Sequence, residues 1–170
     1  DFGTTFSTAC FSVPSQDESG CVSLVNSPFV PTQIFIGSDM TYSIGHRAYS
    51  DFVAGKPGGF YINPKRWVGV DSYNFQAVKR KLKPEYEVKL RDGEIVLGSV
   101  GNVNAPLVRV VDLVYLFVKG ILLETEEAVG KAVSGVVCTV PAEYNSYKRS
   151  FLAVALEGLG KPLRALINEP

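Results

Sequence analysis

Histidine is almost missing from this chain of 170 residues, which contains His46 alone and three cysteines, Cys10, Cys21 and Cys138. No two of these side chains stand at the spacing of a metal-binding motif or a cysteine–histidine catalytic pair. We therefore expect neither a zinc site nor cysteine catalysis, and we assign His46 to the start of a helix. The odd number of cysteines predicts reduced thiols, as in a cytosolic protein.

Net charge and long hydrophobic runs are also absent. Lys and Arg together number 17, as do Asp and Glu, so no overall field draws the chain to nucleic acid or to an anionic membrane. The most apolar stretch, residues 110–123, is interrupted by Asp112 and Lys119 and is shorter than the roughly 20 residues of a membrane span. It predicts a core helix. Because we find no leader sequence and no N-x-S/T sequon, we do not expect secretion.

The chain does contain a hydroxyl-rich turn at its start, Asp1-Phe2-Gly3-Thr4-Thr5-Phe6-Ser7-Thr8, with no initiator methionine in front. Gly3 is expected to let the backbone approach a ligand closely, with successive N–H groups directed at an anion. Thr4 and Thr5 add hydroxyl donors, and Asp1 can hold magnesium through water. The octet, which we expect to begin in mid-strand, predicts a nucleoside triphosphate site. Ordinary hairpin turns have a similar composition, so the octet alone leaves both interpretations open.

Three further segments narrow the choice: Asn63-Pro64-Lys65-Arg66-Trp67-Val68-Gly69, Val140-Pro141-Ala142-Glu143-Tyr144-Asn145-Ser146-Tyr147-Lys148-Arg149, and Ile167-Asn168-Glu169-Pro170. In this order, together with the octet, they resemble the ATPase domain of the 70-kilodalton heat-shock chaperone family over the whole chain. The chain is most similar to the closterovirus branch, the plant-virus homologues of that chaperone. For example, Glu143-Tyr144-Asn145 stands where cellular members usually have Tyr-Phe-Asn.

Hydrophobic periodicity and turn residues predict an α/β fold. The expected strands cover residues 1–13, 21–25, 30–36, 86–90, 94–97, 135–140 and 163–167, and the expected helices cover 46–53, 74–82, 106–129 and 146–159, with a turn or short helix at 65–70. The first three strands suggest an antiparallel meander, residues 135–140 read as a fully buried strand, and the last strand–helix–strand unit suggests parallel pairing. This order agrees with the actin-like, ribonuclease H-like ATPase lobe that the resemblance implies. We expect residues 1–170 to form its first lobe, with a smaller α+β subdomain inserted at about residues 38–105.

The resemblance also implies roles for particular residues. Phosphoryl transfer needs a lysine, a carboxylate and magnesium around the γ-phosphate. The matching lysine is Lys65, which would reach the phosphate and position water, and the matching carboxylate is Glu169, which would orient water at the metal or act as a base. Pro141 and Arg149 match a relay that senses the bound nucleotide. The alternatives are a solvated lysine, a strand-terminal carboxylate and a proline that merely ends a strand.

The family implies a magnesium-dependent ATPase that works in virion assembly and cell-to-cell movement. Its ligands would be ATP or ADP, its partners viral coat or movement proteins, and its location the host cytoplasm, the virion or the plasmodesmata. A structural virion or movement module that hydrolyses nothing remains open, as does, more remotely, a small-molecule kinase of the same superfamily. The second phosphate loop, the adenosine pocket and a C-terminal domain would lie beyond residue 170. We therefore expect negligible ATP hydrolysis by the 170-residue chain alone.

Overall fold

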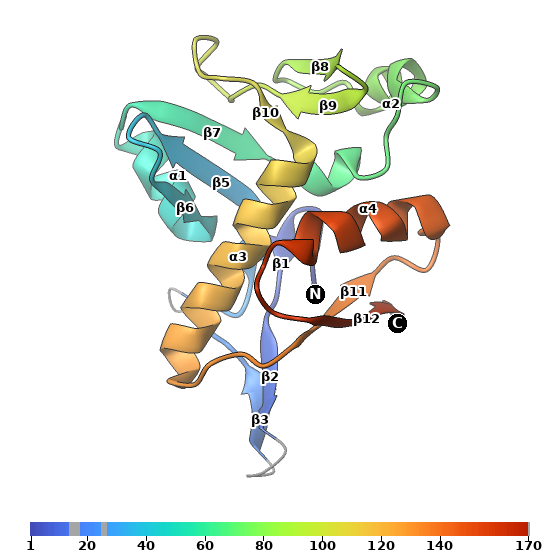
Figure 1. Cartoon of the computed structure of the whole chain (residues 1–170). Helices are drawn as coiled ribbons and strands as arrows, with labels where there is room; N and C mark the ends of the chain where they lie inside the picture. Colours follow the sequence, from blue (N-terminus) through green and yellow to red (C-terminus); the bar gives the residue numbers. More distant parts are fainter. Residues whose placement is uncertain (14–17, 25–26, 170) are drawn as a thin grey trace.

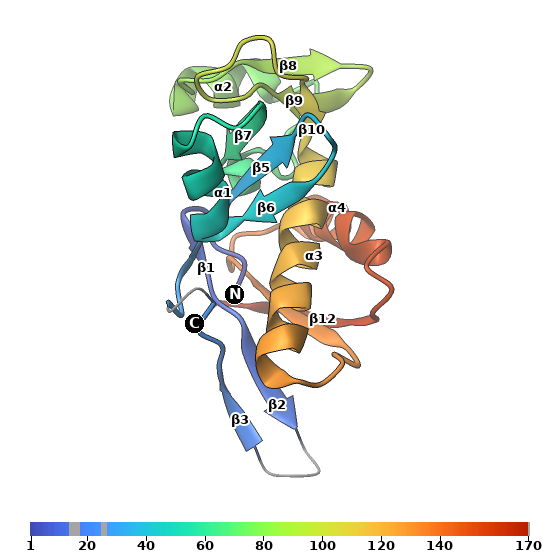
Figure 2. The same ribbon diagram turned by 90° about the vertical axis from the view of Figure 1, so that its left-hand side faces the viewer.

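The computed structural model describes residues 1–13, 18–24 and 27–169, arranged as several small sheets around one long helix, α3 (Val110–Val129) (Figure 1). The view turned by 90° shows α3 passing from the upper sheets to the level of the first hairpin (Figure 2). Val25, within an expected strand, and Pro170, within an expected motif, lie outside the described residues.

The first strands pair antiparallel, as the predicted meander requires, but they form separate two-stranded sheets. Strand β1 (Phe6–Ser7) pairs with β4 (Val30–Pro31), and β2 (Cys10–Val13) pairs with β3 (Glu18–Cys21). The β2–β3 hairpin projects from the rest of the molecule (Figure 1). Its base is anchored, because Val22, immediately after β3, is buried in the core.

Two three-stranded antiparallel sheets follow. The first has the order β6 (Tyr42–Ile44), β5 (Gln33–Gly37), β7 (Gly58–Ile62), and the second has the order β10 (Val108–Arg109), β9 (Glu94–Leu97), β8 (Val88–Arg91). Helix α1 (Gly45–Val53) connects β6 to β7 within the first sheet. The 3₁₀ helix η2 (Pro64–Trp67) and α2 (Phe75–Leu82) lie between the two sheets along the chain, and all three are close to the predicted helices and short turn. The β8–β9 turn has positive φ angles at Asp92 (52°) and Gly93 (83°), as a tight hairpin turn requires.

Helix α3 supplies the centre of the core. Leu113, Val114 and Phe117 are fully buried at the three-and-four spacing expected of a core helix. The prediction that this helix begins at residue 106 is wrong. Val108 and Arg109 form β10, whose pairing with β9 keeps them extended just before the helix begins. None of the described helices combines the length and hydrophobicity that crossing a bilayer requires.

The C-terminal unit confirms the parallel pairing. Strands β11 (Val136–Val140) and β12 (Leu163–Asn168) pair parallel and are joined by α4 (Ser146–Glu157). The prediction that β11 is fully buried is wrong, since Val137 is 54% exposed. Within the described residues, β11 has one partner strand, and part of β11 lines an apolar cavity of about 750 Å³ between β2, α3 and β11.

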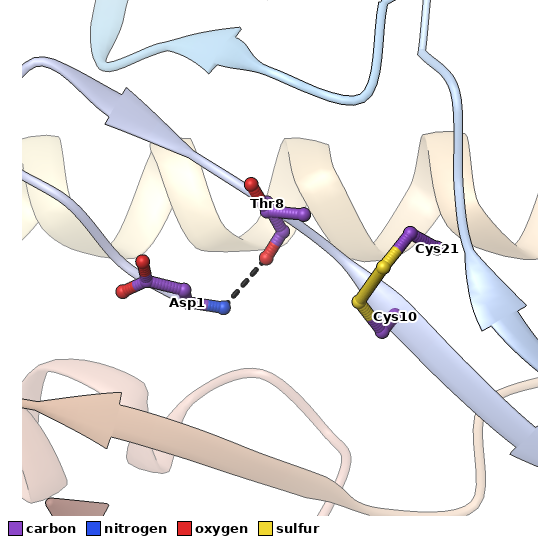
Figure 3. Close-up of a disulfide and its surroundings, with 4 residues drawn as sticks. All are labelled: Asp1, Thr8, Cys10 and Cys21. Carbon is purple, nitrogen blue, oxygen red and sulfur yellow. Dashed lines mark hydrogen bonds between the residues drawn. A yellow bond between two sulfur atoms is a disulfide. The ribbon is translucent and has the colours of Figure 1, made fainter. Parts of the chain in front are cut away.

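The hairpin corrects the expectation of three reduced thiols. Cys10 and Cys21 lie directly opposite each other across β2 and β3 and form a disulfide (Figure 3). Cys138 is free and buried. In the neighbouring pair, Val22 N–H donates to the Ala9 carbonyl at 2.8 Å. Cys10 and Cys21 therefore form a non-hydrogen-bonded pair, the type in which the Cα atoms of opposite residues lie closer together. Cysteine counting did not find this bond because it depends on the register of the hairpin.

Candidate functional site

The Asp1–Thr8 turn is closed by its own backbone and by hydroxyl groups. Thr8 N–H donates to the Asp1 carbonyl at 2.9 Å, and the Asp1 amino group donates to the Thr8 carbonyl at 2.6 Å (Figure 3). Inside the turn, Gly3 N–H donates to Ser7 Oγ at 3.1 Å, and Thr32 Oγ1 donates to the Gly3 carbonyl at 2.9 Å. The buried Ser7 and Thr32 hydroxyls lie 3.0 Å apart. Side chains from two segments therefore fix the shape of the turn.

Gly3 is required by close approach within the turn. A Cβ atom at this position would lie 1.8 Å from the Phe6 carbonyl oxygen, a distance that no side chain can tolerate. The Gly3 N–H is engaged by Ser7, so it is not among the N–H groups left for an anion. Thr4 is half-buried and Thr5 is exposed, and the backbone carbonyl of Thr5 accepts from Thr32 N–H at 2.8 Å.

Lys65 is buried beside this turn. It belongs to η2, which begins at Pro64 after Asn63 takes the left-handed conformation with φ of 53°. Its side chain is only 4% exposed, so Lys65 is not the solvated surface lysine of the alternative interpretation. Its Nζ donates to the Phe2 carbonyl and, at 3.1 Å, to Glu169 Oε1. The fold thus joins the phosphate-loop candidate to both predicted catalytic residues.

The carboxyl ends of the two parallel strands bring acidic groups to the same place. Glu169 directly follows β12, and its N–H donates to the Val140 carbonyl at 2.8 Å, while its side chain remains 33% exposed. From β11, Thr139 Oγ1 donates to Asp1 Oδ1 at 3.0 Å. The structure therefore brings Asp1, Lys65 and Glu169 into one site. The described residues contain no cluster of three His, Cys, Asp or Glu that could hold a metal unaided, so the water-mediated role of Asp1 stays a prediction.

Aromatic and apolar groups surround the Lys65 ammonium. Its Nζ lies 5.6 Å from the centre of the Phe2 ring and 5.9 Å from that of Tyr144. Burial, with a smaller contribution from the Glu169 carboxylate, raises the pKa of the Tyr144 hydroxyl to about 12. Burial likewise raises the pKa of the Cys138 thiol, which interacts electrostatically with Lys65 and Glu169. The lysine therefore lies in a low-dielectric environment, where its charge is weakly screened.

The two predicted relay residues are connected through the turn after β11. Pro141 follows the last residue of β11, and its carbonyl accepts from Tyr144 N–H at 2.9 Å. Arg149 Nε donates to the Tyr144 carbonyl at 3.0 Å, and its guanidinium also reaches the Leu166 carbonyl at 3.4 Å and the Asn168 side chain. Arg149 thus links the turn to the end of β12. Whether this link senses a nucleotide stays a prediction.

Some residues of the site were not found from the sequence. Ser7 belongs to the octet and Thr32 to no motif given above, but their contact was not predicted, because it depends on the pairing of β1 with β4. Thr139 carried a weak signal, since it lies near the carboxyl end of a predicted parallel strand, where ligand-facing groups gather. Trp67, beside the Lys65–Arg66 pair, is fully buried and donates to the Tyr86 hydroxyl at 3.0 Å, so it is a packing residue.

The large apolar cavity is separate from the Lys65–Glu169 pair. It touches the site at Asp1, Phe2 and Thr139, but neither Lys65 nor Glu169 lines it. The cavity and the ion pair are therefore neighbouring but distinct features of the structure.

The comparisons with known proteins agree with the family resemblance. No protein-family model matches the chain. It is 49% identical over 173 residues to the movement protein Hsp70h of Grapevine leafroll-associated virus 3, covering all of this chain and 31% of that protein. It is 31% identical over 179 residues to the movement protein Hsp70h of beet yellows virus, covering all of this chain and 29% of that protein. A chaperone protein HscA homolog of Shewanella denitrificans is 28% identical over 141 residues, covering 83% of this chain and 22% of that protein.

The chain spans just under a third of the length of the viral relatives it matches. Its similarity extends to a bacterial chaperone as well as to viral movement proteins, as the motifs predicted.

Proposed function

The chain belongs to the closterovirus homologues of the 70-kilodalton heat-shock protein, and from this premise we propose that it forms one side of a magnesium–ATP site in a viral chaperone-like movement protein. In this proposal residues 1–170 are the first lobe of an actin-like ATPase domain, with an inserted subdomain at about residues 38–105. The β11–α4–β12 unit and the mixed α/β architecture support that assignment.

One observation carries the proposal. Lys65, an almost fully buried lysine, makes an ion pair with Glu169 and donates to the backbone of the Asp1–Thr8 turn. Burying an ammonium is costly unless it is paired, so a buried lysine beside the Asp1–Thr8 turn is more easily explained by a functional role than by stability. A role in neutralising phosphate charge provides one.

Each residue then has a distinct task. An ammonium has three N–H donors, and the two acceptors given above leave one of them for a phosphate oxygen. The partly exposed Glu169 carboxylate would orient the attacking water or a water at the metal. The Asp1 carboxylate, held by Thr139, would bind the hydration shell of magnesium, while Gly3, Thr4 and Thr5 form the phosphate turn. Magnesium, when bound, supplies charge neutralisation at the phosphates.

The cellular role follows from the relatives that are named movement proteins. We propose action in virion assembly and cell-to-cell movement, with coat or movement proteins as partners, in the host cytoplasm, the virion or the plasmodesmata. The link from Pro141 through Tyr144 to Arg149 would report the state of the nucleotide to the rest of the protein.

The test is magnesium-dependent ATP hydrolysis by the full-length protein, comparing wild type with Lys65→Ala. Loss of one charge-stabilising donor of this kind lowers kcat by about a hundredfold or more. Lys89→Ala is the matched control, because Lys89 is 54% exposed and pairs only at the surface with Glu87, at 2.6 Å. Hydrolysis that is equal in all three proteins would refute the role of Lys65. No hydrolysis in any of them would favour the non-hydrolysing virion or movement module.

A further inference from the structure

The surroundings of the Lys65 ammonium suggest how it is kept in place, an inference that rests on the proposed ATP site. Two acceptors, the Phe2 carbonyl and Glu169 Oε1, are held at this ammonium. Hydrogen bonds to two acceptors leave an ammonium free to pivot about them, and the Glu169 side chain is itself one-third exposed. Something else must limit where the ammonium can go.

We propose that Phe2 and Tyr144 are positioning residues whose rings hold the Lys65 ammonium at the phosphate turn. Both ring centres lie within the distance of about 6 Å at which a ring attracts a cation. A ring attracts the ammonium through its quadrupole and carries no net charge. A further carboxylate here would neutralise the lysine, whereas the rings leave its positive field for a phosphate.

The structure restrains Phe2 through packing of its ring and Tyr144 through its backbone. The Phe2 ring is 4% exposed and packs against Phe117 of α3, with ring centres 6.0 Å apart. The Tyr144 backbone is fixed on both sides, by its N–H bond to the Pro141 carbonyl and by the bond that its own carbonyl accepts from Arg149. The rings come from opposite ends of the chain, so this arrangement exists only in the folded protein.

Tyr144, two residues before α4, also lies close to a lysine of that helix. The Nζ of Lys148 lies 5.0 Å from the same ring, and the Lys148 side chain packs over Gly69, two residues after the end of η2. The Tyr144 ring is therefore near two ammonium groups, that of Lys65 in the site and that of Lys148 on α4. Its replacement by an aliphatic side chain removes both attractions while keeping an apolar group in the same space.

The first test does not depend on hydrolysis. Full-length protein is treated with an amine-acetylating ester, and acetylation of each lysine is followed by mass spectrometry. We expect Tyr144→Leu to acetylate about three- to thirtyfold faster at Lys65, the range that a desolvated cation–ring contact supplies, and Tyr144→Phe to match wild type. Tyr147→Leu is the matched control, because Tyr147 is a nearby tyrosine in the first turn of α4 and is 51% exposed.

Lys79 reports on folding within the same sample. Its Nζ donates to the Val88 carbonyl at 2.7 Å and lies 5.5 Å from the Phe75 ring. Faster acetylation of Lys79 would mean that a variant has unfolded. If Tyr144→Leu unfolds, Phe2→Leu, which removes the other ring, is tested in its place. Equal Lys65 reactivity in wild type and in a folded Leu variant would overturn the proposal.

The second test separates this inference from the proposed function. In steady-state hydrolysis we expect Tyr144→Leu to lower kcat about tenfold with little change in KM, and Tyr144→Phe to restore it, because any aromatic ring supplies the attraction. A kcat for Tyr144→Leu equal to that of wild type would overturn the positioning role. If the wild type hydrolyses no ATP, the ATPase proposal fails, but the acetylation result still decides whether the rings hold the lysine.

Discussion

Reduction of the Cys10–Cys21 bond should destabilise the 170-residue chain by a calculable amount. The bond joins residues 11 apart, and the loop-closure model assigns a loop of this length about 2.8 kcal/mol at 25 °C. The disulfide should stabilise the whole fold and not the hairpin alone, because Val22 and Leu24, just after β3, belong to the core and Phe11 of β2 packs against that core. For a chain of this size, about 2.8 kcal/mol corresponds to a fall in Tm of about 6 to 11 °C.

The assay is thermal unfolding followed by circular dichroism, with and without a phosphine reductant. The Cys10→Ser/Cys21→Ser double variant is the control: its Tm should equal that of the reduced wild type and should not respond to reductant, since Cys138 forms no disulfide. Alkylation without reductant should modify neither Cys10 nor Cys21. An unchanged wild-type Tm on reduction, or alkylation of both residues before it, would refute the reasoning.

Three other outcomes are expected. Gly3→Ala in the full-length protein should abolish ATP binding by calorimetry, because its Cβ would collide with the Phe6 carbonyl; wild-type affinity would contradict this. Trp67→Ala should lower the free energy of unfolding in denaturant titrations by about 3–5 kcal/mol, whereas Tyr73→Ala, at a 97% exposed site, should leave it unchanged. Burial raises the pKa of Cys138, which reduces its reactive thiolate at a given pH; its alkylation in folded protein should therefore rise at a higher pH than in denatured protein, and coincident profiles would argue against burial.

The elements that sequence predicted well are those with local signals. The β8–β9 turn needs positive φ at Asp92 and Gly93, and that dipeptide supplies it. Helix α4 begins after Asn145, whose side chain accepts from Lys148 N–H at 3.0 Å as an N-cap. The β11–α4–β12 order then allowed the parallel pairing to be predicted. In each case the residues that decide the structure are close together in the chain.

The predictions that failed concern contacts between distant segments. The start of α3 was misplaced because hydrogen bonds to β9 hold Val108 and Arg109 extended. The exposure of Val137 depends on which strands lie beside β11, which periodicity does not reveal. In the site, the family resemblance pointed to Lys65 and Glu169. Its motifs contained Phe2 and Tyr144 too, but their closeness to the lysine is a property of the folded chain alone.

The distance along the chain between Lys65 and Glu169 has a consequence for protein synthesis. They are 104 residues apart, and a ribosome adding about 5–20 residues per second needs about 5 to 20 s to make the intervening segment. During that interval η2 has already been made, but the lysine has no carboxylate partner, so its burial is unfavourable. The N-terminal turn and η2 therefore cannot settle into their final arrangement until β12 has left the ribosomal tunnel. A translational pause before β12 has left the tunnel would prolong the lifetime of an incompletely folded nascent chain, and a later pause would not.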